Sequence, residues 1–109
     1  MVGVENGVVR TTLEQVRAKR PQIERLLKAR GAGNPRVFGS VARSTADDRS
    51  DVDILVDFRE PAPEGFAYFG AIDQLEQDLR RLLAASVHVS VVDPTSPAGQ
   101  KILREAVPL

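Results

Sequence analysis

Apolar and acidic residues alternate along residues 51–58, and this pattern restricts the fold more than any other part of the sequence. The apolar positions are Val52, Ile54 and Val56, and the acidic positions are Asp51, Asp53 and Asp57. Successive side chains of a β-strand point to opposite faces, so the pattern predicts a strand with one apolar and one acidic face. Such a strand needs partner strands, and helices that cover its apolar face.

Two more short strands are expected, at residues 36–38 and 87–92, where apolar residues gather or alternate. The chain turns sharply at residues 31–35, which combine glycine, asparagine and proline. The expected fold class is α+β, with helices and strands in an α/β-like order. Its centre is a small three-stranded mixed sheet with helices packed on it.

Helical patterns surround these strands. A first helix begins at a capping box of Thr11 and Glu14, and Pro21 either kinks it or starts a second helix. A short C-terminal helix is expected over residues 96–106, and a long one over residues 66–82. The long helix carries an apolar stripe, which we expect to lie in the core with its outer edge open to a partner. The stripe consists of Phe66, Phe69, Ile72, Leu75, Leu79 and Leu82.

The 109 residues suffice for one small domain, and we expect a loose leader over residues 1–10 followed by a single domain over residues 11–109. Cysteine is absent, which excludes a disulfide framework, a cysteine-ligated zinc and a thiol nucleophile. No apolar run approaches the length of a membrane-spanning helix, and the leader lacks the apolar run of a signal peptide. We therefore expect a cytoplasmic protein without a membrane partner.

The net charge is zero, with 15 basic and 15 acidic side chains, but the two kinds are unevenly distributed. Residues 1–43 hold nine of the basic and three of the acidic side chains. No aromatic residues are interleaved with the basic run of the first helical pattern, which favours a solvated or protein-docking face over direct nucleic-acid binding. The acidic cluster is either a solvated loop or a group whose charge a metal ion or a basic surface offsets. It comprises Asp47, Asp48, Asp51, Asp53, Asp57 and Glu60.

A sharp turn precedes the acidic strand by ten residues. Gly39 lets the chain turn and approach a ligand closely, and Ser40 with the amides after it is suited to hold a phosphate. Asp51 and Asp53 share one strand face about 6–7 Å apart, and such a pair suits Mg²⁺ together with substrate phosphates. A phosphate cradle beside two metal-binding carboxylates indicates nucleotidyl transfer.

The pair Gly39-Ser40, followed after ten residues by Asp51-x-Asp53, resembles the GSx10DxD signature of the DNA polymerase β-like nucleotidyltransferase superfamily. The likeness to the minimal nucleotidyltransferases, small bacterial and archaeal proteins, is closer still and extends to residues 38–43 and 102–109. The resemblance implies a polymerase β-like nucleotidyltransferase fold. It also implies that Gly39 and Ser40 contact the nucleotide triphosphate and that Asp51 and Asp53 bind Mg²⁺.

The same resemblance implies a partner. Many such proteins are the antitoxin of a toxin–antitoxin pair whose toxin is a helical HEPN ribonuclease, and some transfer AMP from ATP to a tyrosine of that toxin. We therefore expect a heteromeric complex with a HEPN protein, ATP as co-substrate and Mg²⁺ as cofactor. Arg43, which follows the turn, either pairs with a phosphate or forms an ordinary ion pair with the loop at Asp47 and Asp48.

One position departs from the family pattern. The resemblance places a third carboxylate on the next strand, where this chain has Ser90. His88, on the same strand face, is one replacement as a base or a ligand, and Asp93 is another if the strand ends before it. Without a replacement, transfer is slow or lost. The sequence therefore leaves two hypotheses: a Mg²⁺-dependent AMP transferase, or a catalytically weakened or inactive antitoxin that neutralises its toxin by direct binding.

Overall fold

The computed structural model describes residues 11–46 and 50–109, and the expected leader and the acidic Asp47 and Asp48 lie outside the described residues. The helices are α1 (Leu13–Ala18), α2 (Arg20–Ala29), α3 (Gly39–Ala42), α4 (Phe66–Leu83) and α5 (Pro97–Glu105). The strands are β1 (Ala32–Phe38), β2 (Val52–Phe58), β3 (Val87–Ser90) and β4 (Val107–Pro108).

The described strands form one mixed sheet in the order β3-β2-β1-β4. Strand β1 runs antiparallel to β2 and β4, and β2 runs parallel to β3. The predicted α+β class and mixed sheet are confirmed, but the predicted count of three strands is wrong. The fourth strand escaped prediction because it has two residues, one of which is a proline without an N–H donor, and such a segment fits only at a sheet edge.

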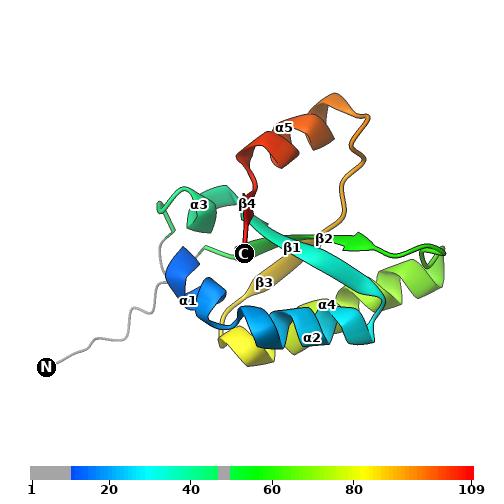
Figure 1. The fold of residues 1–109 in the computed structure, drawn as a ribbon, viewed down its shortest axis with the longest axis horizontal. Helices are drawn as coiled ribbons and strands as arrows, with labels where there is room; N and C mark the ends of the chain where they lie inside the picture. The colour runs from blue at the N-terminus through cyan, green and yellow to red at the C-terminus, as the bar shows by residue number, and fades with distance from the viewer. Residues whose placement is uncertain (1–10, 47–49) are drawn as a thin grey trace, which may run out of the picture.

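Helices α2 and α4 cover one face of the sheet, while α5 stands over the opposite face (Figure 1). The side chains of Val52, Ile54 and Val56 are fully buried in the core beneath α2 and α4. The predicted alternation of β2 is therefore confirmed, and Asp53 lies on the face toward α5. In the described part of the chain, no helix is both long and apolar enough to cross a membrane.

The N-terminal helical region differs in detail from the prediction. The capping box is formed by Thr12 and Gln15, one residue beyond the predicted Thr11 and Glu14. The Thr12 side chain accepts from the Gln15 N–H at 3.2 Å, and the Gln15 side chain accepts from the Thr12 N–H at 3.0 Å. Pro21 lies in the first turn of α2, so of the two alternatives it starts a second helix.

Strand boundaries also differ. Strand β1 begins at Ala32 because the residues expected as a turn are absorbed by a register shift between Gly33 and Arg36. Strand β2 begins after Asp51, and β3 ends at Ser90 rather than at residue 92. Asp51 therefore lies just before β2 and Asp53 lies within it, whereas both were expected in the strand.

The apolar stripe of α4 belongs to the core only in part. Leu75 and Leu79 are fully buried, but Phe66 is 95% and Phe69 is 69% exposed. The helix turns by roughly 100° per residue, so the three-residue spacing from Phe66 onward drifts around the axis. Phe66 and Leu75 are nine residue steps apart, about two and a half turns, so they lie on roughly opposite sides of the helix. The expectation that the whole stripe is core is wrong for its first two members.

Candidate active site

The turn at Gly39 and the carboxylate of Asp53 meet at the junction of β1 and α3. Gly39 has a φ of +75°, a region that L side chains rarely adopt. A Cβ atom at this position would lie 2.5 Å from the Asp53 Oδ2 and 3.4 Å from its Cγ. A glycine is therefore needed both for the turn and for the close approach of the carboxylate, and the predicted neighbourhood of turn and carboxylate is present.

Asp53 lies in the interior of the sheet, between two neighbouring strands. Its Cα partner is Phe38 in β1 and His88 in β3. Burial raises the pKa of the Asp53 carboxyl above its ordinary value. The charges of His88 and Arg43 lower this pKa, whereas the charge of Asp51 raises it further. Three of the residues singled out in the sequence therefore act electrostatically on the fourth, which places them around one centre.

Asp57 lies four residues farther along β2, yet it belongs to a separate cluster. The Asn34 side-chain amide donates to its Oδ2 at 2.9 Å, and the Arg36 guanidinium donates to its Oδ1 at 2.8 Å. Burial alone would raise the pKa of Asp57, but these two partners outweigh it and hold the pKa below its ordinary value. The Asp57 carboxylate is therefore held by Asn34 and Arg36 in a structural role, in contrast to Asp53.

Arg43 ends α3 and reaches toward α5. Its Nη1 lies 3.8 Å from the Glu105 Oε1, and both side chains are largely exposed. The sequence predicted either a phosphate partner or an ion pair with Asp47 and Asp48, and those two residues lie outside the described residues. An exposed pair at this distance is weak, so the guanidinium can exchange Glu105 for a phosphate at little cost.

Ser90 is the last residue of β3. It pairs with Leu55 in the parallel register, two residues beyond the pairing of His88 with Asp53, so its side chain shares their face. A neutral serine hydroxyl supplies neither a negative charge for a metal nor a ready proton acceptor. Ser90 therefore lies on the same sheet face as Asp53 and adds no charge to it.

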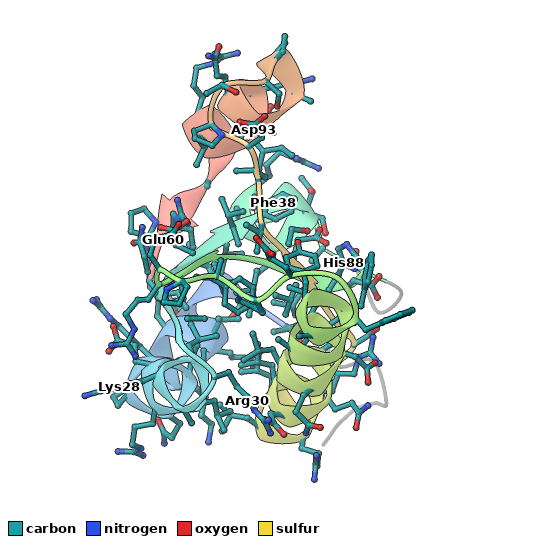
Figure 2. The ribbon with its side chains drawn as sticks, turned by 90° about the vertical axis from the view of Figure 1, so that its right-hand side faces the viewer. Lys28, Arg30, Phe38, Glu60, His88 and Asp93 are labelled. Atoms are coloured by element: carbon teal, nitrogen blue, oxygen red, sulfur yellow. The ribbon has the colours of Figure 1, made fainter. Side chains whose placement is uncertain are left out.

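Asp93 does not replace the missing acid. It lies beyond the end of β3 and near α5, away from Phe38 and the sheet (Figure 2). Its Oδ1 accepts from the Thr95 hydroxyl at 2.6 Å and from the Thr95 N–H at 2.8 Å. These two hydrogen bonds lower the pKa of the Asp93 carboxyl. Asp93 is therefore a turn residue before α5 and a poor proton acceptor.

His88 lies at the edge of the sheet next to α4 (Figure 2). Its Nδ1 is 3.3 Å from the Glu76 Oε2, and the imidazole is 60% exposed. Glu76 was not singled out in the sequence, because an acidic residue within an amphipathic helix normally lies on the solvated face. Glu76 is identified only from the structure, because the packing of α4 against β3 brings its carboxylate to His88.

The donor set suits one type of metal site. In the described residues, no group of three or more His, Cys, Asp or Glu side chains is arranged to hold a metal ion. Mg²⁺ is usually bound by one or two carboxylates, with waters and substrate phosphates completing its shell. Asp51 and Asp53 therefore fit a magnesium ion that arrives with a nucleotide, and they do not form a closed all-protein site.

Comparison with known proteins agrees with this geometry. The sequence profile of the family described as "Nucleotidyltransferase domain" matches residues 20–109. The chain is also similar to a solved structure described as "Structure of putative minimal nucleotidyltransferase", with 37% sequence identity and a TM-score of 0.68. The similarity covers 91% of this chain and 97% of that one. No curated protein sequence matches this chain.

Proposed function

This chain belongs to the nucleotidyltransferase domain family, and from that membership we propose that it transfers AMP from ATP to a hydroxyl of a partner protein. The acceptor we propose is a tyrosine of a HEPN ribonuclease toxin, so the chain acts as an antitoxin. The observation that carries the chemistry is the meeting of the Gly39 turn with Asp53, next to Asp51 and Arg43.

Each residue has a distinct task in this proposal. Gly39 and Ser40 receive the triphosphate, because the turn exposes backbone where no side chain intervenes. Asp51 and Asp53 would hold Mg²⁺, which would supply positive charge against the phosphates. Arg43 leaves Glu105 and pairs with a phosphate oxygen. Together these residues align the α-phosphorus with the attacking hydroxyl, and most of the catalysis of such transfers comes from this alignment and charge neutralisation.

Two conservative variants test this assignment. Asp51→Asn and Asp53→Asn each preserve side-chain shape and remove one negative charge, so the fold stays intact while Mg²⁺-dependent transfer is abolished. Transfer is followed with ATP labelled on its α-phosphate, and circular dichroism reports the fold. Asp57→Asn is a matched control on the same strand, because Asp57 is tied to Asn34 and Arg36. Unchanged transfer in both site variants would refute the proposed site.

A second candidate function is favoured by Ser90. Because the third carboxylate is missing and the described residues hold no three-ligand group, an antitoxin that acts by contact alone remains compatible with this site. It predicts that Asp51→Asn and Asp53→Asn still neutralise the toxin in a growth assay, with no AMP on the toxin. If these variants fail to neutralise although they still bind the toxin, contact is insufficient and the enzymatic proposal holds.

A further inference from the structure

The Glu76 carboxylate is held at the edge of the sheet by several contacts. Its Oε2 accepts from the Val89 N–H at 2.9 Å, and the same oxygen lies 3.3 Å from the His88 Nδ1. Its Oε1 lies 3.8 Å from the Arg80 Nη2. The Glu76 side chain is only 15% exposed, whereas the imidazole is 60% exposed. A fixed carboxylate from α4 thus faces one nitrogen of a solvent-accessible imidazole on β3.

This contact determines which nitrogen of His88 is available. A carboxylate facing Nδ1 favours the hydrogen on that atom, so Nε2 keeps its lone pair and acts as an acceptor. His88 is also the Cα partner of Asp53, so the two side chains leave the sheet on the same face. The imidazole therefore starts from the same face of the sheet as the proposed nucleotide site, where Ser90 offers no carboxylate.

We propose that His88 accepts the proton of the attacking hydroxyl, and that Glu76 is the positioning residue that holds the imidazole for this task. The inference rests on the proposed function. The hydroxyl oxygen forms a bond to the α-phosphorus of ATP, and the bond from that phosphorus to the bridging oxygen breaks. Pyrophosphate leaves with the electron pair. The hydroxyl proton moves to the His88 Nε2, Glu76 balances the resulting imidazolium charge, and solvent later takes the proton.

Kinetics separate this role from a structural one. His88→Gln is expected to lower kcat for AMP transfer by about 100-fold or more, the usual effect of losing a general base, without raising KM for ATP. Glu76→Gln keeps an acceptor for the Val89 N–H but removes the charge, so kcat falls while the fold is kept. Added imidazole restores transfer to His88→Gly. A full rate in His88→Gln would overturn the proposal.

The closing experiment reads the imidazole itself. His88 is the one histidine of the chain, so nitrogen NMR of the imidazole reports this residue alone. The wild type is expected to carry its hydrogen on Nδ1, Glu76→Gln to lose this preference, and the control Glu24→Gln to retain it. Mg²⁺ with α,β-methylene-ATP should then shift both the imidazole signals and the amides of Gly39 and Ser40.

The outcomes are distinguishable. If the amides shift but the wild-type imidazole shows no dependence on Glu76, or does not respond to the nucleotide, the inference fails while the proposed function stands. If the amides of Gly39 and Ser40 do not respond to the nucleotide, the proposed function fails, and the inference fails with it.

Discussion

Replacing Gly39 by alanine separates backbone strain from the placement of the Asp53 carboxylate. Gly39 and Gly31 have the same φ of +75°, so each alanine variant forces an L side chain into the left-handed region. The two sites differ in their surroundings. A Cβ at Gly31 meets nothing within 4 Å, whereas a Cβ at Gly39 lies 2.5 Å from the Asp53 Oδ2. Gly31→Ala is therefore a matched control for Gly39→Ala.

The expected magnitudes follow from these two terms. The left-handed conformation costs an L residue about 1–2 kcal/mol, so both variants lose that much unfolding free energy. For a chain of this size, this lowers Tm by roughly 5–15 °C. Real Cβ contacts are not shorter than 3.0 Å, so the Asp53 carboxylate moves by about half an ångström or more in Gly39→Ala. Because misplacement by 1 Å costs about 100-fold in rate, transfer falls at least roughly tenfold.

Urea unfolding and AMP transfer, measured on both variants, test this reasoning. The carboxylate is the far end of a side chain and can rotate away, so the stability losses of the two variants should agree. Only Gly39→Ala should lose transfer and the binding of Mg²⁺ with α,β-methylene-ATP. The reasoning is refuted if Gly39→Ala transfers AMP as well as Gly31→Ala does.

Three further predictions concern the sheet and α4. Because the pKa of Asp53 is raised, the native state binds its proton more tightly, so stability falls as pH rises from 3.8 through the raised pKa. Asp53→Asn should therefore be more stable than the wild type in urea at about pH 7, and equal to it below pH 3.8. Asp57→Asn removes a carboxyl of lowered pKa, so this variant should be less stable than the wild type at about pH 7. Ser90→Asp restores the missing acid and should raise transfer measured with labelled ATP; no gain would show that this acid is not what limits the rate. Phe66→Ser should change stability by less than about 0.5 kcal/mol because Phe66 is exposed, while Leu75→Ala should cost about 2–5 kcal/mol; equal losses would contradict the drift of the α4 stripe.

The parts of the fold that sequence predicted are those with short-range patterns. The alternation in β2 identified the strand and its buried face, and Gly39 marked the turn that meets Asp53. Each of these signals lies within a few residues, where the geometry of a strand or a turn fixes the side-chain directions. The end of β3 was harder to predict from sequence, because the apolar residues after Ser90 continue the strand pattern although the strand pairing has ended.

The unpredicted parts arise from contacts between distant segments. Glu76 reaches His88 only because α4 packs beside β3, and Glu105 reaches Arg43 only because α5 returns over the sheet to β4. No spacing in the sequence encodes either pair. The prediction that the whole α4 stripe is buried was wrong for a different reason. Repeated steps of three residues match the helical period over one turn but drift away from it over several turns.

The most direct test of the account is the intact mass of a HEPN partner protein after incubation with this chain, ATP and Mg²⁺. The account predicts a gain of one or more AMP groups, which disappears with EDTA and with Asp53→Asn. An unchanged mass, with the two proteins still forming a stable complex, would contradict AMP transfer and favour an antitoxin that acts by contact.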